Sequence, residues 1–321
     1  MTHVLALCGG VGGAKLAFGL ARNLDASELT IVVNTGDDFE HLGLTISPDL
    51  DTVAYTLAGL SDRERGWGLA GETWGFMASL RRLGGEDWFQ LGDQDLAMHV
   101  ERTRRLAAGQ SLSQITRDLT AALGIRHLIA PMSDQAVRTV VDTLDGEMPF
   151  QRYFVAERCQ PVVQAVRYVG AQQARPSPGF QEALARSDLE AVILCPSNPY
   201  LSLDPILCIP GVRTALKRSN ARVVAVSPIV GGAAIKGPTA KLMKELGVEP
   251  SVVSVARHYD GLLDGIIIDP VDAGAAADVG ALGVEPLVTA AVMRSDEDRV
   301  RLAGEAVSMA LRLERRRSVS A

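Results

Sequence analysis

Acidic residues that directly follow apolar runs are the side chains of this sequence best placed for chemistry. Asp37 and Asp38 come shortly after the apolar run Leu29–Val33. At the end of a buried strand, such carboxylates can meet a ribose, a divalent metal or a substrate hydroxyl. Carboxylates also cap the turn or helix that follows them, so capping stays an alternative for this pair.

A second acidic pair, Asp49 and Asp51, stands in the segment SPDLDT, which leads into the apolar run Val53–Leu60. Proline and acids suit the start of a helix, where a carboxylate gains roughly 0.3–1 kcal/mol from the helix dipole. Side chains at positions i and i+2 of a helix point in different directions, so capping explains one of them only. The other is available to bind a metal or to accept a substrate proton.

The glycine-rich stretch GGVGGAK, from Gly9 to Lys15, is suited to close approach by an anion. Glycines permit positive φ, and unpaired N–H groups at a helix start attract phosphate. Both common fingerprints are incomplete, since Lys15 replaces the third glycine of a dinucleotide site and Ala14 replaces the glycine before the P-loop lysine. The stretch still predicts a phosphorylated ligand, with a tight strand-to-helix connection as the alternative.

Apolar segments predict the elements that position these motifs. Val4–Leu7 is a strand candidate before the glycines, and Leu16, Leu20 and Leu24 then recur at helical spacing. Leu29–Val33 is a second strand candidate. In an open parallel sheet the ligand crevice lies outside the carboxyl ends of the strands, so the glycine turn and the acidic turn are expected to be neighbours.

The same pattern of strand and loop returns in the last third of the chain. Ala191–Leu194 and Arg222–Val226 are strand candidates that end in proline-containing loops. These loops present Ser197, Asn198 and Ser227, whose hydroxyl and amide groups can bind a ligand in the same crevice. Further strands are predicted at Val252–Val255, Ile266–Ile268 and Leu287–Val292, and an amphipathic helix at Asp296–Leu313.

The middle third holds the three tryptophans, two helical segments and a hairpin candidate with Asp145-Gly146 as its turn. His99 lies four residues after Asp95, so the two pair if one helix spans both. We interpret this region as an insertion that closes over the sheet as a lid, with aromatic residues that pack in its core or stack on a planar ring.

The predicted fold class is α/β: a Rossmann-like, mostly parallel sheet with helices on both faces and an inserted, largely helical subdomain with a hairpin. The 321 residues form a single domain in this prediction. Its core comes from about residues 1–60 and 175–321, and about 61–170 form the inserted lid.

The amino-acid composition limits the classes of partner that the protein is expected to bind. The net charge is −6, and the first basic run is Arg315–Arg317, so neither nucleic acid nor an anionic membrane is expected. No signal peptide or membrane-spanning apolar segment is recognised. The four scattered cysteines predict reduced thiols in a cytoplasmic protein.

An ordered set of motifs carries a family resemblance that runs from the first turn to about Leu246. The chain resembles the 2-phospho-L-lactate transferase family of deazaflavin coenzyme biosynthesis. The matching segments are GGVGGAKL (9–16), NTGDD (34–38), SPDLDT (47–52), LGDQD (91–95), PMSD (131–134), PSNP (196–199) and SPI (227–229).

The resemblance implies a transferase that takes a guanosine diphosphate ester of a small acid. The phospho-acid unit passes to the terminal ribityl hydroxyl of the deazaflavin Fo, and GMP leaves, giving the precursor of coenzyme F-420. Family members require Mg²⁺ and are commonly dimeric, so a homodimer that binds only small molecules is expected. The acid, whether lactyl, enolpyruvyl or glyceryl, stays open.

The resemblance also implies site residues. Asp51, Gln90 and Asp93 fall on the deazaflavin side, and Gln90 is neutral where some members carry Lys or Arg. For the chemistry, Asp37 and Asp38 are expected to hold Mg²⁺, and Asp49 or Asp51 to orient the hydroxyl or accept its proton. We expect Asp51→Asn to leave the fold intact and to lower turnover. The donor side comprises Gly10, Val11, Gly12, Gly13, Lys15, Ser197, Asn198 and Ser227.

Two rival functions remain. A non-catalytic regulator that binds sugar nucleotides shares this kind of glycine turn, but it has less use for several acids beside a phosphate. A nicotinamide-dependent oxidoreductase is disfavoured by the broken dinucleotide fingerprint. GMP release separates the transferase from the regulator, and bound NAD(P) would indicate the oxidoreductase.

Overall fold

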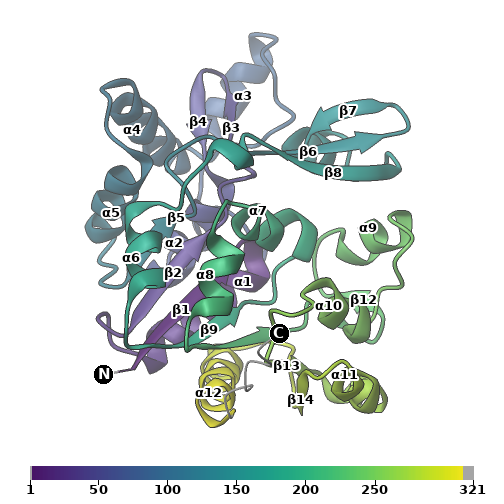
Figure 1. The fold of residues 1–321 in the computed structure, drawn as a ribbon. Helices are drawn as coiled ribbons and strands as arrows, with labels where there is room; N and C mark the ends of the chain where they lie inside the picture. The colour runs from purple at the N-terminus through teal and green to yellow at the C-terminus, as the bar shows by residue number, and fades with distance from the viewer. Residues whose placement is uncertain (1, 314–321) are drawn as a thin grey trace.

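A computed structural model describes residues 2–313 of the chain (Figure 1). Its centre is a seven-stranded sheet in which every pair of neighbouring strands is parallel. The predicted mostly parallel sheet is therefore confirmed. In spatial order the strands are β14 (Glu285–Val288), β13 (Gly265–Ile268), β10 (Arg222–Val226), β9 (Leu189–Leu194), β1 (His3–Cys8), β2 (Leu29–Val33) and β5 (Leu128–Pro131).

Helices cover both faces of this sheet, because its strands are apolar on both sides. In β1, Val4 and Ala6 belong to one core cluster, while Leu5 and Leu7 belong to the other. The first face packs against α1 (Gly10–Asn23), α2 (Pro48–Ala58) and α12 (Asp296–Arg312), and the second against α6 (Pro178–Ala185), α8 (Val212–Arg218) and α10 (Val252–His258).

The strand order reverses between β1 and β9. From β1 the chain proceeds through β2 to β5 on one side, and from β9 through β10 and β13 to β14 on the other. At such a switch point the loops after the two central strands diverge and leave a crevice at their carboxyl ends. The glycine turn follows β1 and the Ser197 loop follows β9, so this topology brings them together.

The remaining elements lie beyond the carboxyl end of the sheet or on its flanks (Figure 1). A second sheet has the order β7-β6-β8 and contains the predicted hairpin with a third strand added. The elements are β3 (Phe39–His41), β4 (Leu44–Ile46), α3 (Gly75–Arg82), α4 (Asp95–Ala107), α5 (Leu112–Ala122), β6 (Arg138–Thr143), β7 (Gly146–Pro149), β8 (Val163–Val169), α7 (Asp204–Leu207), β11 (Ile229–Val230), β12 (Ala233–Ala234), α9 (Thr239–Glu245) and α11 (Ala276–Ala281).

Three sequence-based expectations need correction. The strand predicted at Leu287–Val292 is β14, which covers Glu285–Val288, so residues 289–292 lie outside it. Val252–Val255 forms the start of α10 instead of a strand, because the Ser251 side chain caps the helix by accepting from the Ser254 N–H. Strand β5 lies within residues 61–170 yet pairs with β2 at the edge of the central sheet. The predicted inserted segment thus contributes a strand to the core.

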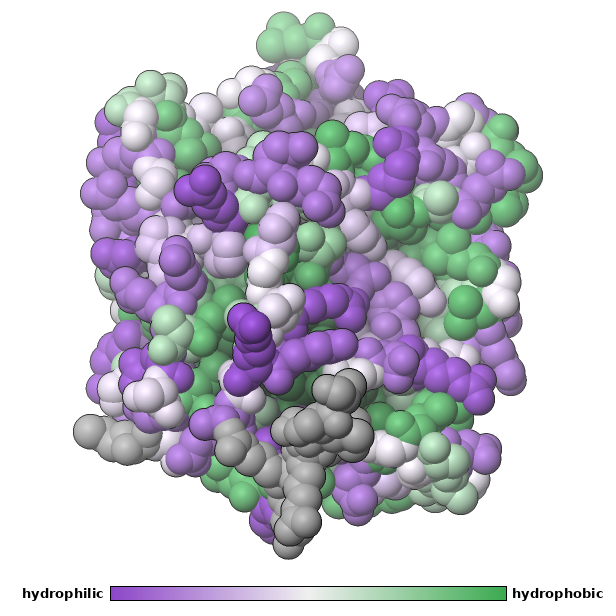
Figure 2. Space-filling view, viewed as in Figure 1, coloured by the Kyte–Doolittle hydropathy of each residue, from purple (hydrophilic) through white to green (hydrophobic). Residues whose placement is uncertain are grey.

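The hydrophilic surface and the free cysteines agree with what the composition predicts. On the face in Figure 2, hydrophilic residues cover most of the surface, and hydrophobic residues form separate groups. Among residues 2–313, no helix combines the length and the apolar character needed to cross a bilayer. All four cysteines are free thiols, as predicted.

Candidate active site

The first turn of α1 is pinned to the loop after β9. The Gly9 N–H donates to Ser197 Oγ over 3.1 Å, and Ser197 Oγ–H donates back to the Gly9 carbonyl over 2.8 Å. Gly10 adopts a φ of 62°, which favours glycine. The Val11 and Gly12 N–H groups come next, in the turn where an α-helix supplies no acceptor. These amides give the helix start its capacity to bind an anion.

The neighbouring glycines allow this close packing. A Cβ on Gly12 would overlap the Pro196 carbonyl oxygen, and one on Gly13 would lie 2.5 Å from Ser197 Oγ. Any side chain at these positions would push α1 away from the Ser197 loop. Gly12 and Gly13 therefore have a packing role that the common phosphate fingerprints do not describe. They allow the start of α1 to pack against the loop that follows β9.

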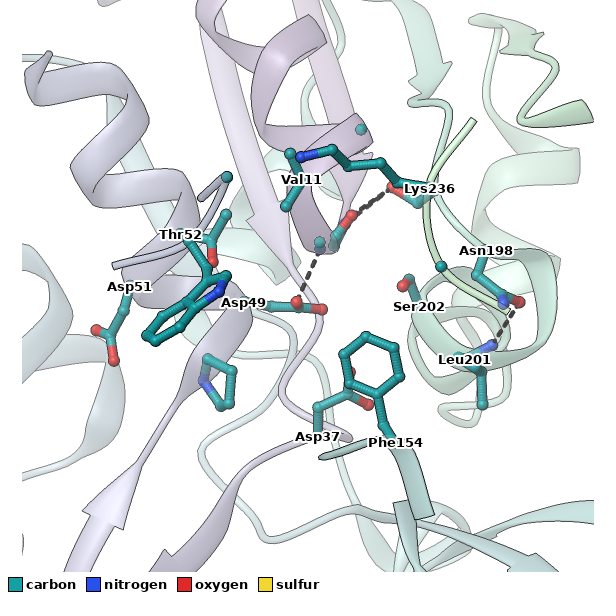
Figure 3. A pocket seen from close by; sticks show the side chains of 18 of the residues that line it. Val11, Asp37, Asp49, Asp51, Thr52, Phe154, Asn198, Leu201, Ser202 and Lys236 are labelled. Atoms are coloured by element: carbon teal, nitrogen blue, oxygen red, sulfur yellow. Dashed lines mark hydrogen bonds between the residues drawn. The ribbon is translucent and has the colours of Figure 1, made fainter. Parts of the chain in front are cut away.

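Asp49 connects the glycine turn to the acidic turn after β2. Its Oδ1 accepts the Gly10 N–H over 2.8 Å, and its Oδ2 accepts from Asn34 Nδ2 over 2.9 Å. The Asn34 side chain also accepts from the Gly36 N–H over 2.8 Å, which fixes the turn. The two predicted motifs are thus neighbours, and Asp49 lies between Val11 and Asp37 in Figure 3.

Three buried acids share this corner with few compensating charges. Burial, with added repulsion from Asp49 and Asp38, raises the pKa of Asp37 well above its ordinary value. Burial likewise raises the pKa of Asp38 to about 7 and that of Asp49 to about 6. Oδ1 of Asp37 and Oδ1 of Asp38 have no hydrogen-bond partner among the described residues.

This donor set fits a hard divalent cation in its chemistry. Mg²⁺ binds carboxylate oxygens and commonly combines one or two of them with phosphate oxygens of a substrate. Across residues 2–313 there is no cluster of three or more His, Cys, Asp or Glu side chains arranged for a metal. The unpartnered Oδ1 atoms of Asp37 and Asp38 are of the kind that such an ion prefers.

Asp51 forms hydrogen bonds with partners other than those of Asp49. Both of its oxygens accept from the Arg102 guanidinium, one of them over 3.1 Å from Nη1, and Arg102 also donates to the Thr45 carbonyl over 3.4 Å. Arg102 is 3% exposed, so the ion pair is buried. Asp51 is accordingly engaged with α4, and neither it nor Asp49 acts as the cap of α2.

A single cavity of about 670 Å³ joins these groups. A cavity of this size suits a drug-sized or larger ligand. Ser197, Asn198 and Ser227 line it from the tips of β9 and β10, as the sequence predicted. From the other predicted site residues it includes Gly10, Val11, Gly12, Lys15, Asp37, Asp49, Asp51 and Gln90.

Three predicted residues do not line this cavity: Gly13, Asp38 and Asp93. Gly13 packs beneath the turn, and Asp38 accepts from Ser47 Oγ–H over 2.9 Å. Asp93 caps α3 by accepting the Gly75 and Phe76 N–H groups, each over 2.9 Å. Deazaflavin binding by Asp93 stays a prediction, and its carboxylate already has these structural partners.

The chain matches the family described as 2-phospho-L-lactate transferase CofD over residues 4–301. It is 42% identical over 316 residues to a phosphoenolpyruvate transferase of Streptomyces griseus, covering 96% of this chain and 98% of that protein. It is 41% identical over 264 residues to a 2-phospho-L-lactate transferase of Methanosarcina mazei, covering 82% and 86%.

The chain belongs to the 2-phospho-L-lactate transferase family. This confirms the predicted family and the predicted enzyme class. A crystal structure of a UPF0052 family member from Bacillus halodurans aligns with a TM-score of 0.61 at 16% identity, covering 95% of this chain and 98% of that one. At that identity it supports the Rossmann-like fold alone.

Aromatic and cationic side chains of this 2-phospho-L-lactate transferase family member also line the cavity. The Arg65 guanidinium lies 5.2 Å from the Trp67 ring centre and 4.9 Å from that of Trp74. Trp67 is 43% exposed, and both Trp67 and Phe154, which is labelled in Figure 3, line the cavity. Apolar walls of this kind suit a planar ring.

Lys15 and Lys236 add positive charge beside the glycine turn. Lys15 Nζ donates to the Met293 carbonyl over 3.1 Å. Burial lowers the pKa of Lys15, and repulsion from Arg299 and Lys236 lowers it further. An anionic ligand would relieve this repulsion. The sequence analysis proposed Lys15 but missed Lys236, which lies in a glycine-rich loop far along the chain.

Other residues missed from the sequence are Arg102 and Tyr55. Both lie on helix faces that meet only after folding. The single available signal was the Asp95–His99 spacing, which the structure confirms with a distance of 3.2 Å between Asp95 Oδ2 and His99 Nε2. Extending that helical stripe by one turn reaches Arg102.

Proposed function

We propose that this enzyme transfers a phosphoenolpyruvyl unit from a guanosine diphosphate ester to the terminal ribityl hydroxyl of Fo. The proposal is carried by one observation: a single cavity contains both a helix start suited to phosphate and two aspartates suited to an alcohol. The choice of acid is supported by relatives named phosphoenolpyruvate transferase, which align over 96% of this chain at 41–42% identity.

On the donor side, the Val11 and Gly12 amides, Lys15 and Lys236 would bind the diphosphate. These groups line the same cavity as Ser197. They would stabilise the negative charge that grows on the leaving GMP. Magnesium stays a prediction. Asp37, which lines the cavity, would hold the ion, whereas Asp38 does not line the cavity and would reach it only after a rearrangement. When bound, the ion would neutralise diphosphate charge.

On the acceptor side, the hydroxyl oxygen forms a bond to the phosphorus that bears the acid. The bridging bond from that phosphorus to the GMP phosphate oxygen breaks, and the hydroxyl proton leaves to a base. Asp49 is our candidate for this base because its pKa of about 6 lies close to neutral pH. Asp51, held by Arg102, would orient the hydroxyl.

The test is a comparison of donors. The protein is incubated with Fo, Mg²⁺ and the enolpyruvyl, lactyl or glyceryl diphosphoguanosine ester; GMP is quantified and the product mass is measured. We expect fastest turnover with the enolpyruvyl donor. Faster turnover with the lactyl donor would replace the proposed acid, and donor binding without GMP release would favour the regulator. Cytoplasmic location and homodimer formation stay predictions.

A further inference from the structure

One buried nitrogen beside the cavity has a carboxylate neighbour but no well-aligned hydrogen bond. His99 lines the cavity, its side chain is 2% exposed, and its Nε2 makes no hydrogen bond within the described residues. Asp95 Oδ2 is 3.2 Å away, but the two atoms are not in hydrogen-bonding geometry. A buried donor without a well-aligned acceptor is unfavourable, so we expect a ligand atom to bind at this position.

Arg102 determines what kind of partner Nε2 needs. Its Nη1 lies 3.3 Å from His99 Nδ1, and a guanidinium can only donate hydrogen bonds. Nδ1 therefore accepts, and in the neutral ring the hydrogen resides on Nε2. Nε2 is therefore a hydrogen-bond donor on a side chain that lines the cavity.

Acceptors stand next to this donor on two facing helices. Asp95, His99 and Arg102 form one stripe of α4, opposite Asp51 and Tyr55 on α2. The Tyr55 hydroxyl donates to Asp95 Oδ1 over 2.5 Å, which leaves Oδ2 to accept another hydrogen. Asp51, Tyr55, Asp95 and His99 all line the cavity.

We propose that His99 and Asp95 form a binding subsite for a non-terminal hydroxyl of a polyol chain. His99 Nε2–H donates to the hydroxyl oxygen, and the hydroxyl hydrogen is donated to Asp95 Oδ2. The inference rests on the proposed function, because the ribityl chain of Fo supplies hydroxyls besides the one that reacts. Binding one of them beside Asp51 would set the position of the terminal hydroxyl.

Such a subsite makes the enzyme selective. An acceptor without the matching hydroxyl would leave both the imidazole N–H and the carboxylate unpaired. We expect a loss of about 10-fold to 100-fold in kcat/KM for that acceptor. The His99 side chain contacts Asp51, Asp95 and Arg102, none of which belongs to the proposed donor side, so the KM for the guanosine ester should not change.

The experiment pairs acceptor analogues with His99 variants. Wild type, His99→Leu, His99→Gln and the control His127→Gln are assayed with Fo and with analogues that each lack one non-terminal ribityl hydroxyl. The control is apt because His127 Nε2 contacts the Leu24 carbonyl, just beyond the end of α1 opposite the glycine turn. KM and kcat are measured separately for acceptor and donor.

We expect one analogue to lose activity with wild type, and His99→Leu to lose as much with Fo but nothing further with that analogue. His99→Gln, which keeps an N–H donor, should recover part of the loss. Equal activity of wild type with all analogues would overturn the subsite, and this comparison stands even when a variant does not fold. Unchanged acceptor KM in His99→Leu would overturn it too.

The outcomes separate this inference from the proposed function. Normal turnover of Fo by wild type, with no effect of the analogues, removes the subsite alone. If wild type neither binds Fo nor releases GMP in its presence, both ideas fall together.

Discussion

Asp49 and Asp51 lie two residues apart on α2 and form hydrogen bonds with different partners. Asp49 accepts from the Gly10 backbone and Asn34, whereas Asp51 is held by the buried Arg102. A helix turns about 100° per residue, so the two carboxylates diverge and reach different elements. The two carboxylates are close in sequence, but the helical rotation between them gives them different partners in one cavity.

The sequence-based expectation that Asp51→Asn leaves the fold intact needs revision. Removing one member of a buried ion pair leaves the Arg102 charge uncompensated and costs about 3–5 kcal/mol of unfolding free energy. We expect turnover to fall by about 100-fold or more as well. Chemical denaturation and steady-state GMP release measure the two effects.

A double variant, Asp51→Asn with Arg102→Met, is the matched control. It removes both charges and should recover much of the lost stability while turnover stays low. Recovery of turnover together with stability would show that Asp51 acts on the fold alone.

Asp38 predicts a pH dependence of stability. Burial raises its folded pKa from the unfolded value of 3.8 to about 7, so the folded state binds more protons between those values. Its contribution to stability is therefore present at low pH and is lost as pH rises toward 7. In metal-free protein, Asp38→Asn should be increasingly more stable than wild type between pH 5 and pH 8 on this account.

Thermal melts of wild type and Asp38→Asn across this pH range check the prediction. Added Mg²⁺ should raise the melting temperature of wild type more than that of the variant, because a bound cation would offset the cost of burying the ionised Asp38 carboxylate. A constant difference between the two proteins at every pH would contradict the assignment.

At the scale of elements, the α1 glycines connect two strand tips. A Cβ on Gly12 would overlap the Pro196 carbonyl oxygen. We expect Gly12→Ala to cost about 1–3 kcal/mol, as overpacking does, and to weaken binding of GDP. Denaturant unfolding and calorimetric GDP titration measure these effects.

Gly280→Ala in α11 is the control for this change. A Cβ there meets nothing within 4 Å, so the variant should keep wild-type GDP affinity and gain up to about 1 kcal/mol in stability. Wild-type GDP affinity in Gly12→Ala would argue against the glycine turn as the donor site.

The whole molecule brings together two parts of the chain around one cavity. The loop with Arg65 and Trp67 and the π-helical turn Arg152–Ala156 come from the predicted insertion, and the strand tips come from the core. A ligand that touches both parts should order them together. We expect the segment 61–74 to lose amide exchange when Fo and GDP bind, by about 10-fold in rate.

Hydrogen exchange with mass spectrometry tests this expectation, with α5 as the internal reference because its residues do not line the cavity. Equal protection of both segments would indicate general stabilisation. Unchanged exchange at 61–74 would contradict closure of the predicted lid.

The sequence by itself predicted the central strands β1, β2, β9 and β10 and the glycine turn, and 11 of the 14 site residues that it proposed line the cavity. These features depend on local periodicity and on the end of each strand. The sequence predicted a strand at Val252–Val255, but this β-branched run starts helix α10 because the Ser251 side chain caps it. Folding alone decided that Arg102 contacts Asp51, that Lys236 lies near Lys15, and that the His99 ring lies between Asp95 and Arg102. Those contacts join residues far apart in the chain, and their energies depend on burial, which no local pattern specifies.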